Sequence, residues 1–416
     1  MATQGIPLSR LIMSRSRAKY SPQNLLGAGV NTTRVPLIVV LAITYLPAQN
    51  AGNPHANGRG AIGVRCELAR DGSTCRIRAV VAQSPADRAG LHVGDLLLKL
   101  DKPGGSVIEQ IAKTAPGIRV DIPFQRGDQR NHVVITVEDQ LALCLRASEL
   151  GDVSAEINLG EIYLQGDGVA KSSTEALKWY RKAADGNSSE AQAALGWMYL
   201  KGSGVRQDEQ AAFYWYKKAA ASGYPAAESQ LGYMYGEGRG VTKDSKAALQ
   251  WYLRAAEHGD PAAEVTLGDI YRQGFGVPVN ANRAAEWYRK AADQGVPEAE
   301  AHLGSMYFDG IGVPRDDSMA LRLFREAAAQ NQAEAEFGLG VMYGFGRGVP
   351  KDDAAAMGWY RKAAAKGDAA AEYYIGMMYE SGSGVPKDLT IAADWYQKAA
   401  DHGFEQAKSK LQDLRK

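Results

Sequence analysis

Residues 59–64, Arg-Gly-Ala-Ile-Gly-Val, have the composition of a backbone loop that binds an anion. Glycine lets the main chain approach a ligand closely and point several N–H donors at one anion. Apolar residues beside such a loop form a pocket for a neighbouring side chain. Alone, the same residues also fit an ordinary glycine at the start of a strand, so the surrounding sequence must decide between the two interpretations.

The histidines form no recognisable catalytic or metal-binding pattern. None stands in a triad arrangement or at metal-ligand spacing, and no Gly-x-Ser-x-Gly sequence occurs. The sequence therefore predicts no catalytic residue, no metal site and no cofactor. The histidines are His55, His92, His132, His258, His302 and His402.

The three cysteines are Cys66, Cys75 and Cys144. Cys66 and Cys75 face each other if the hairpin between them has its loop at 69–72, which allows a disulfide in an oxidising compartment. A two-residue turn at Asp71-Gly72 puts them out of register, so both states stay open. Cys144 is expected to be a buried apolar residue.

The elements around residues 59–64 are short strands and turns. Runs with β-type composition, bounded by turn residues, predict five strands, and serine caps predict two short helices. The expected strands are 64–68, 75–81, 96–100, 119–124 and 132–137, and the expected helices are 84–90 and 107–113. This pattern predicts a small α+β, barrel-like domain.

Two further stretches give this segment a specific resemblance. Ser84-Pro85-Ala86, followed by Arg88-Ala89-Gly90-Leu91, and the run at 93–98 resemble PDZ domains of the bacterial type. Arg59, Gly60, Ala61, Ile62, Gly63 and Val64 then occupy the place of that family's carboxylate-binding loop.

The PDZ resemblance implies how a peptide binds. The N–H groups of Ile62, Gly63 and Val64 hold the C-terminal carboxylate of a partner, and the peptide adds a strand beside 64–68. Its side chains rest against a helix that contains Val107 and Ile111. Val107 stands at the first groove-facing position of that helix, which favours an apolar residue two before the peptide's end.

The rest of the chain is an array with an unvarying interval of 36 residues. In each unit a Leu-Gly or Ile-Gly pair is followed by a tyrosine, a Gly-x-Gly-Val turn, and a Trp-Tyr pair that Leu323-Phe324 replaces once. We expect each unit to be helix, glycine loop, helix. The glycines of the first pair are Gly160, Gly196, Gly232, Gly268, Gly304, Gly340 and Gly376.

Two other columns predict the ends of the second helix of each unit. One column contains residues that cap helix N-termini: Ser172, Asp208, Asp244, Asn280, Asp316, Asp352 and Asp388. The other contains glycine or asparagine, which tolerate the left-handed conformation of a C-terminal cap: Asn187, Gly223, Gly259, Gly295, Asn331, Gly367 and Gly403. A glycine inside the first helix costs about 1 kcal/mol against alanine, and the missing Cβ is expected to permit close helix packing.

These signatures closely resemble Sel1-like repeats, which are related to tetratricopeptide repeats. The predicted fold is multidomain, a small α+β PDZ-like barrel followed by an all-α helix-turn-helix solenoid, an α/α superhelix. The expected boundaries are 57–138 for the PDZ-like domain, 139–152 for an N-terminal capping helix, 153–403 for seven repeats and 404–416 for a C-terminal capping helix.

Residues 1–51 contain five arginines or lysines and no acidic residue, ahead of the apolar run 35–46. This pattern predicts an export signal and a periplasmic or secreted bacterial protein. An uncleaved membrane anchor at 35–46 or a transit peptide is the alternative. Lys and Arg number 48 and Asp and Glu 47, without long blocks of one sign, which argues against nucleic-acid binding.

The function predicted from the sequence is an exported, non-enzymatic adaptor that joins a C-terminal or extended peptide to a second protein on the solenoid. Its partners are proteins or peptides, and contact with a membrane is expected only through an uncleaved signal. Trp197 and Tyr233 are the expected ligand anchors if the first helices line a concave face, with ordinary packing as the other interpretation. A regulatory subunit of an exported protease or cell-wall enzyme, or a solenoid hydrolase with an unrecognised site, remains an alternative.

One more column places a carboxylate in the first turn of the first helix. A position near the positive end of the helix dipole is enough to explain it. The column contains Glu156, Gln192, Glu228, Glu264, Glu300, Glu336 and Glu372.

Overall fold

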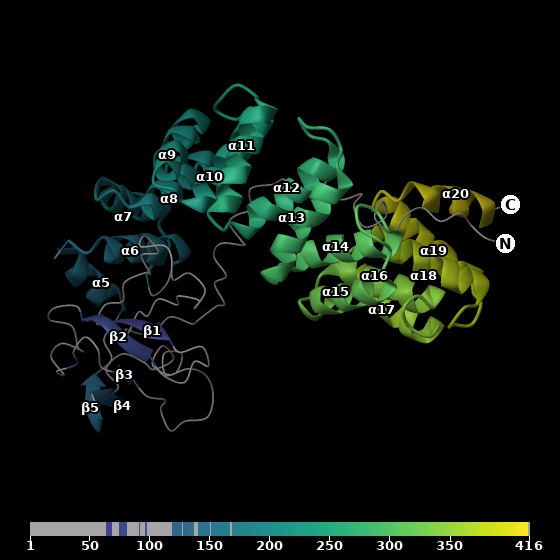
Figure 1. Ribbon diagram of the computed structural model, residues 1–416, viewed down its shortest axis with the longest axis horizontal. Coiled ribbons are helices and arrows are strands. Elements are labelled where there is room, and N and C mark those ends of the chain that lie inside the picture. Colours follow the sequence, from purple (N-terminus) through teal and green to yellow (C-terminus); the bar gives the residue numbers. More distant parts are fainter. Residues whose placement is uncertain are drawn as a thin grey trace. The chain divides into compact units, whose positions relative to one another are not determined.

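A computed structural model describes residues 64–68, 75–80, 91, 96–97, 119–126, 128–136, 140–149, 151–166 and 169–414 (Figure 1). The chain divides into two compact units between Lys243 and Asp244, and each unit is described by itself. The first contains a sheet and the helices up to α10, and the second contains the helices from α11 to α20.

The described residues include a sheet of five strands in the order β1-β2-β3-β4-β5, each antiparallel to its neighbours. Each of the five predicted strands is found, and the fourth and fifth extend further toward the turn between them, to Arg126 and from Gln129. The strands are β1 (Val64–Leu68), β2 (Cys75–Val80), β3 (Leu96–Leu97), β4 (Arg119–Arg126) and β5 (Gln129–Thr136). The helices expected at 84–90 and 107–113 lie outside the described residues.

The register between β1 and β2 differs from the one that would place Cys66 opposite Cys75. Cys66 is paired with Ile77 and Cys75 with Leu68. This is the register that a two-residue turn at Asp71-Gly72 gives, which is one of the two arrangements that the sequence left open. The two cysteines are therefore not opposite each other, and a bridge between them stays a prediction.

In the part of the chain that the structure describes, sixteen helices follow the sheet. Most have the same length, as a constant repeat interval requires. They are α5 (Gln140–Glu149), α6 (Val153–Gln165), α7 (Ser173–Asp185), α8 (Ser189–Lys201), α9 (Glu209–Ala221), α10 (Pro225–Glu237), α11 (Ser245–Glu257), α12 (Pro261–Gln273), α13 (Ala281–Asp293), α14 (Pro297–Asp309), α15 (Asp317–Ala329), α16 (Ala333–Phe345), α17 (Asp353–Ala365), α18 (Ala369–Ser381), α19 (Leu389–Asp401) and α20 (Glu405–Leu414).

We call the even-numbered helices from α6 to α18 helix A and the odd-numbered helices from α7 to α19 helix B. Within each of the two compact units, helix A packs on the helix B that follows it in the same repeat, and helix B packs on the next helix A. The helices α5 and α20 cover the exposed ends of this stacking, against α6 and α19 respectively. Both were predicted as capping helices.

Local chemistry sets the ends of helix B. Each predicted N-cap side chain accepts a backbone N–H of the first turn, and in α17 Asp352 Oδ1 accepts from the N–H of Ala355 at 2.8 Å. The glycine or asparagine predicted to end each helix B has a positive φ in every repeat, including Asn187 at 61° and Asn331 at 63°. Both predicted columns are confirmed.

The glycine inside helix A makes room for an aromatic ring of helix B. A Cβ built on Gly340 would come within 2.5 Å of the Tyr360 ring, and one built on Gly268 within 2.5 Å of Tyr288. The Tyr or Phe of helix B is thus inserted against bare backbone. Rings in this position are buried: Tyr216, Tyr288 and Tyr396 are 1% exposed or less.

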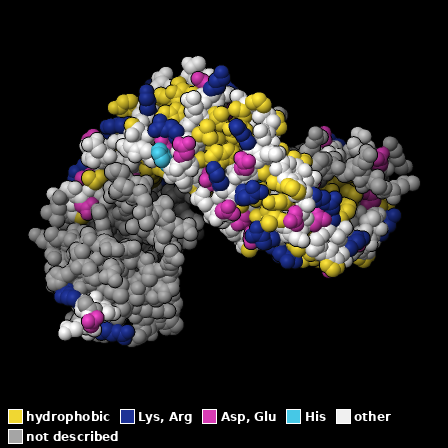
Figure 2. Space-filling view, in the orientation of Figure 1, with side chains coloured by type: hydrophobic (Ala, Val, Ile, Leu, Met, Phe, Trp, Pro, Cys, Tyr) yellow, Lys and Arg dark blue, Asp and Glu magenta, His cyan; other side chains and the backbone are white. Residues whose placement is uncertain are grey.

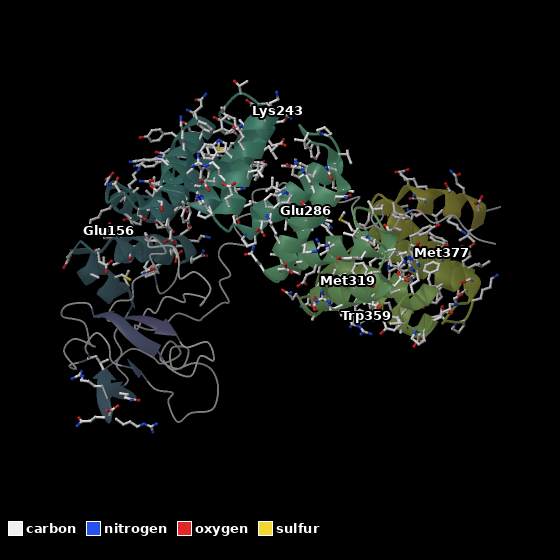
Figure 3. All side chains as sticks on the ribbon, in the orientation of Figure 1. Glu156, Lys243, Glu286, Met319, Trp359 and Met377 are labelled. Carbon is white, nitrogen blue, oxygen red and sulfur yellow. The ribbon has the colours of Figure 1, made fainter. Side chains whose placement is uncertain are left out.

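Tryptophans of helix B are half-buried, at the edge of this core. In six repeats a lysine or arginine of the next turn lies over the indole ring, as Lys362 Nζ does 3.9 Å from the ring centre of Trp359 on α17 (Figure 3). Such cation–π contacts contribute roughly 0.5–1 kcal/mol each where exposed. The other pairs are Lys182–Trp179, Lys218–Trp215, Arg254–Trp251, Lys290–Trp287 and Lys398–Trp395.

Candidate functional site

Val64, the last residue of the expected carboxylate-binding loop, begins β1. Among the described strands β1 lies at one end of the sheet order and pairs only with β2. An end strand has backbone groups available for an added peptide strand. Arg59, Gly60, Ala61, Ile62 and Gly63, together with Val107 and Ile111, lie outside the described residues, and their role stays a prediction.

The two predicted anchors on helix A have different surroundings. Trp197 is half-buried and packs against a core cluster that includes Tyr180 and Leu195. Tyr233 is only 7% exposed, and Arg239 covers its ring at 5.9 Å from the ring centre. Tyr233 therefore offers little surface to a ligand.

A polar cluster fills the same helix A position in the repeat of α12 and α13. The hydroxyl of Tyr288 donates to Asp269 Oδ1 at 2.8 Å, Arg272 Nη2 donates to the same oxygen at 2.5 Å, and Arg272 Nε donates to the Tyr288 hydroxyl at 3.1 Å. Burial raises the pKa of Asp269, but His302, Arg272 and these hydrogen bonds outweigh it, so the pKa lies below its usual value. The carboxylate of Asp269 therefore stays charged, and its hydrogen bonds join α12 to Tyr288 of α13.

The carboxylate column of helix A is buried, which sequence reasoning missed. Its members are 6% exposed or less. Four contacts among the described residues join this column to the side chain just before the glycine or asparagine that ends helix B, as His402 Nδ1 lies 2.8 Å from Glu372 Oε2. The other three are Gln294 with Glu264 at 2.7 Å, Gln330 with Glu300 at 3.4 Å, and Lys366 with Glu336 at 2.7 Å.

Burial changes the proton affinity of two members of this column. Loss of solvation raises the pKa of Glu264, partly offset by the hydrogen bond from Gln294, and it raises the pKa of Glu300, to which Glu326 adds. Burial is therefore the largest influence on the pKa of these two carboxylates, and the explanation from sequence did not include it. The sequence did contain a signal for these contacts, because the carboxylate and the residue just before the end of helix B are always 30 residues apart.

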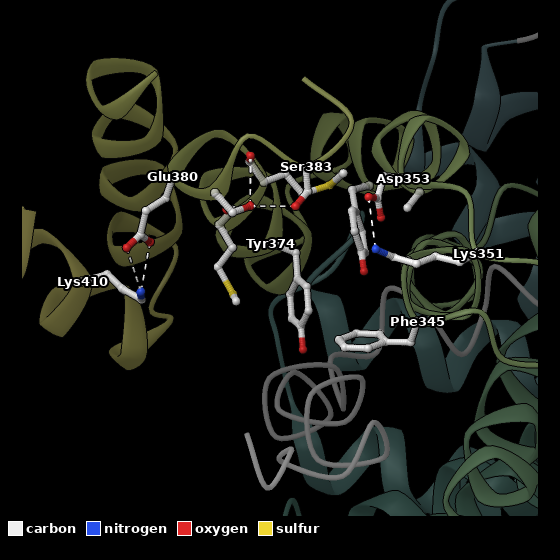
Figure 4. A pocket seen from close by; sticks show the side chains of 13 residues that line it. Phe345, Lys351, Asp353, Tyr374, Glu380, Ser383 and Lys410 are labelled. Carbon is white, nitrogen blue, oxygen red and sulfur yellow. Dashed lines mark hydrogen bonds and ion pairs between the residues drawn. The ribbon is translucent and has the colours of Figure 1, made fainter. Parts of the chain in front are cut away.

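A pocket of about 370 Å³ opens where α16, α17 and α18 meet (Figure 4). Gly344, Phe345 and Tyr360 line it from the first two helices, and Tyr374 and Met377 from α18. Two ion pairs lie on either side of Tyr374 in Figure 4: Lys351 with Asp353 at 3.2 Å and Glu380 with Lys410 at 2.9 Å. No sequence prediction included this site.

Charges of both signs are interspersed with hydrophobic side chains over the described helices (Figure 2). In the part of the chain that the structure describes, no cluster of three or more His, Cys, Asp or Glu side chains has the arrangement of a metal site. No helix among the described residues combines the length and the apolar character that a membrane span needs.

Comparison with known proteins identifies both parts of the chain. The Sel1 repeat family matches seven consecutive segments over residues 153–404, and a PDZ domain matches residues 60–137. No curated protein matches the chain.

Two solved structures share the helical repeat. One is a protective antigen with an SLR fold from uropathogenic Escherichia coli, at 37% identity and a TM-score of 0.60. The match covers 67% of this chain and 60% of that protein, so this chain matches less than two thirds of its relative's length. The other is a Sel1 repeat protein from Oxalobacter formigenes, at 35% identity and a TM-score of 0.52, covering 66% of this chain and 79% of that one.

PDZ domains and Sel1 repeats are in general protein-binding modules. The repeats take up more than half of the chain, and the paired helices, caps and close glycine–aromatic contacts fit that assignment. The chain belongs to the Sel1-repeat proteins and carries a PDZ domain ahead of its repeats.

Proposed function

We propose that this chain is an exported, non-enzymatic adaptor that binds two partners. The observation that carries the proposal is the presence of two different protein-binding modules in one chain, a PDZ domain at 60–137 and seven Sel1 repeats at 153–404. Linking two binding modules raises the effective concentration for the second contact once the first is made. Bridging is therefore the function that this combination supports best.

The PDZ domain binds the C-terminus of its partner. The N–H groups of Ile62, Gly63 and Val64 receive the terminal carboxylate, and the peptide extends along β1. The place of β1 at an end of the described sheet supports this binding mode. Val107 and Ile111 contact the peptide side chains and favour apolar ones.

The solenoid binds the second partner through its side chains, and it performs no chemistry. One buried polar cluster supports that assignment, because Asp269 and Tyr288 are engaged with each other and with Arg272. A catalytic acid or base needs an open hydrogen-bonding position toward a substrate. Export rests on the basic, acid-free stretch 1–51 and its apolar run 35–46.

The test is a bridging assay with the full chain. Peptides with free C-termini are selected against immobilised protein, and a second library with blocked C-termini is selected against the same protein. The proposal expects ligands from both selections to bind one molecule together, with Gly63→Trp abolishing only the first class. Competition between the two classes for a single site would contradict an adaptor.

A further inference from the structure

The pocket over Gly344 opens at a position where five of the seven repeats have a side chain and this repeat has glycine. The position precedes the aromatic residue of helix B by 16 residues. Its residues are Leu164, Leu200, Gly236, Arg272, Phe308, Gly344 and Glu380. Gly344 has open space on this side, since an added Cβ would meet only Ala356 Cβ at 3.5 Å and the Tyr360 hydroxyl at 3.6 Å.

The same column supplies hydrogen-bond partners for the hydroxyl groups of two other repeats. Arg272 donates to the Tyr288 hydroxyl at 3.1 Å, and the Tyr396 hydroxyl donates to Glu380 at 2.5 Å. Glycine at 344 leaves the Tyr360 hydroxyl without such a partner among the described residues, although Tyr360 is only 2% exposed and lines the pocket. The hydroxyl is therefore available to a ligand in the pocket, and one hydrogen bond to it contributes about 0.5–1.5 kcal/mol.

The walls indicate which ligand would fit. Phe345 and Tyr374 present aromatic rings, and the thioethers of Met377 and Met378 make favourable contacts with aromatic groups. The lysines and carboxylates at the rim are already paired, Lys351 with Asp353 and Lys410 with Glu380. Because each charge at the rim is already paired with an opposite charge, the pocket favours a neutral ligand over an anion or a cation.

Size and exposure narrow the choice. A volume of about 370 Å³ lies at the lower end of the range for ligand pockets, roughly 300–1,000 Å³, and it accommodates one ring with adjoining atoms. Phe345 at the mouth is 60% exposed, so it offers apolar contact outside the pocket to the molecule that carries the ring.

The Tyr360 hydroxyl is a hydrogen-bond donor. Burial raises its pKa well above the usual value, and Tyr374 and Asp353 raise it further, so the hydroxyl stays protonated and can donate.

We propose that this pocket binds a neutral aromatic side chain that bears a hydrogen-bonding oxygen, a tyrosine of the second partner, with its oxygen accepting from the Tyr360 hydroxyl. The inference rests on the proposed function, because it places the solenoid's partner at α16, α17 and α18. It makes Tyr360 and Gly344 the specificity-determining residues of this site.

The experiment follows the methionine methyl groups of the full chain by NMR, with N-acetyltyrosine amide as the probe. The protein has 10 methionines, and the Met377 and Met378 signals are assigned by substitution. We expect the probe to shift these two signals, and N-acetylphenylalanine amide to bind about tenfold more weakly, the effect of one hydrogen bond to a buried group.

Variants separate the pocket from general effects. Gly344→Leu copies the Leu200 arrangement and should abolish the shifts, while Tyr360→Phe, which copies Phe324, should remove the preference for tyrosine over phenylalanine. Tyr216→Phe is the matched control, because it removes a tyrosine hydroxyl at the same position of another repeat, where the hydroxyl is buried and lines no part of this pocket. It should change nothing. Shifts that persist in Gly344→Leu, or no shifts in the unsubstituted chain, would overturn the proposal.

A blocked pentapeptide with a central tyrosine tests the source of the ring. It should bind at least as tightly as the amide, because Phe345 adds contact outside the pocket. A pocket that accepts the amide and rejects the pentapeptide would overturn the assignment to a partner protein. These probes have no free carboxylate, so their failure would leave peptide binding by the PDZ domain, measured separately with Gly63→Trp, unaffected.

Discussion

The ring of Tyr360 lies against the bare backbone of Gly340, so closely that a Cβ there would come within 2.5 Å of it. One helical turn further on, Gly344 would accept a Cβ at ordinary contact distance from Ala356 and the Tyr360 hydroxyl. Two glycines of α16 thus have opposite roles. Gly340 is required by packing, and Gly344 opens the pocket.

Alanine at these two positions should therefore change stability in opposite directions. Gly340→Ala forces Tyr360 out of its place, which should lower the free energy of unfolding by roughly 1–3 kcal/mol. The better helix propensity of alanine offsets about 1 kcal/mol of that loss. Gly344→Ala keeps the propensity gain without a clash. We expect a lower urea midpoint for the first variant and an equal or higher one for the second. Equal losses would show that the ring does not dictate the glycine.

The N-cap column makes a second prediction at Asp352. Its carboxylate accepts the N–H of Ala355, and Asp352→Ala should lower the free energy of unfolding by about 1 kcal/mol. Thermal unfolding of the full chain measures the change. Asp352→Ser should restore most of the stability, because Ser172 caps α7 in the same way. A serine variant as weak as alanine would contradict the cap explanation.

The buried carboxylate of Glu300 makes stability depend on pH. Its pKa in the folded chain lies above the ordinary value of 4.5, so folding favours the protonated form. The stability from this group is complete below about pH 4.5 and is lost as the pH rises through the folded pKa. Glu300→Gln, which copies Gln192 in the same column, should raise the melting temperature at pH 7 by a few degrees, about 1 kcal/mol or less.

The advantage of Glu300→Gln should shrink as the pH falls toward 4, where the wild-type carboxyl is protonated too. Glu286→Gln on the exposed surface of α13 is the control and should alter stability little at either pH. A Glu300→Gln variant that is less stable than the wild type at pH 7 would mean that the helix dipole outweighs burial at this position.

Much of the solenoid follows from local rules that the chain repeats. Capping by Asp352 and the positive φ of Asn331 each depend on a few neighbouring residues, so their columns predicted the helix ends correctly. The glycine column also predicted close packing between helices, because helix A lacks a Cβ at the same position in every repeat.

The contacts that sequence reasoning missed are those between elements. The contact of Glu372 with His402 spans 30 residues and depends on how helix A and helix B pack, so a local explanation of the carboxylate was insufficient. The pocket forms because Gly344 has no side chain to fill the space. The sequence motifs identify residues that are present, so they did not predict this cavity.

The most direct test of the adaptor account measures binding of the full chain to peptides that differ only in a free or amidated C-terminus. The account predicts that binding requires the free carboxylate, favours an apolar residue two before the end, and is lost in Gly63→Trp. Gly344→Leu serves as the control variant and should bind these peptides normally. Equal binding of free and amidated peptides, or binding that survives Gly63→Trp, would contradict carboxylate recognition by residues 59–64.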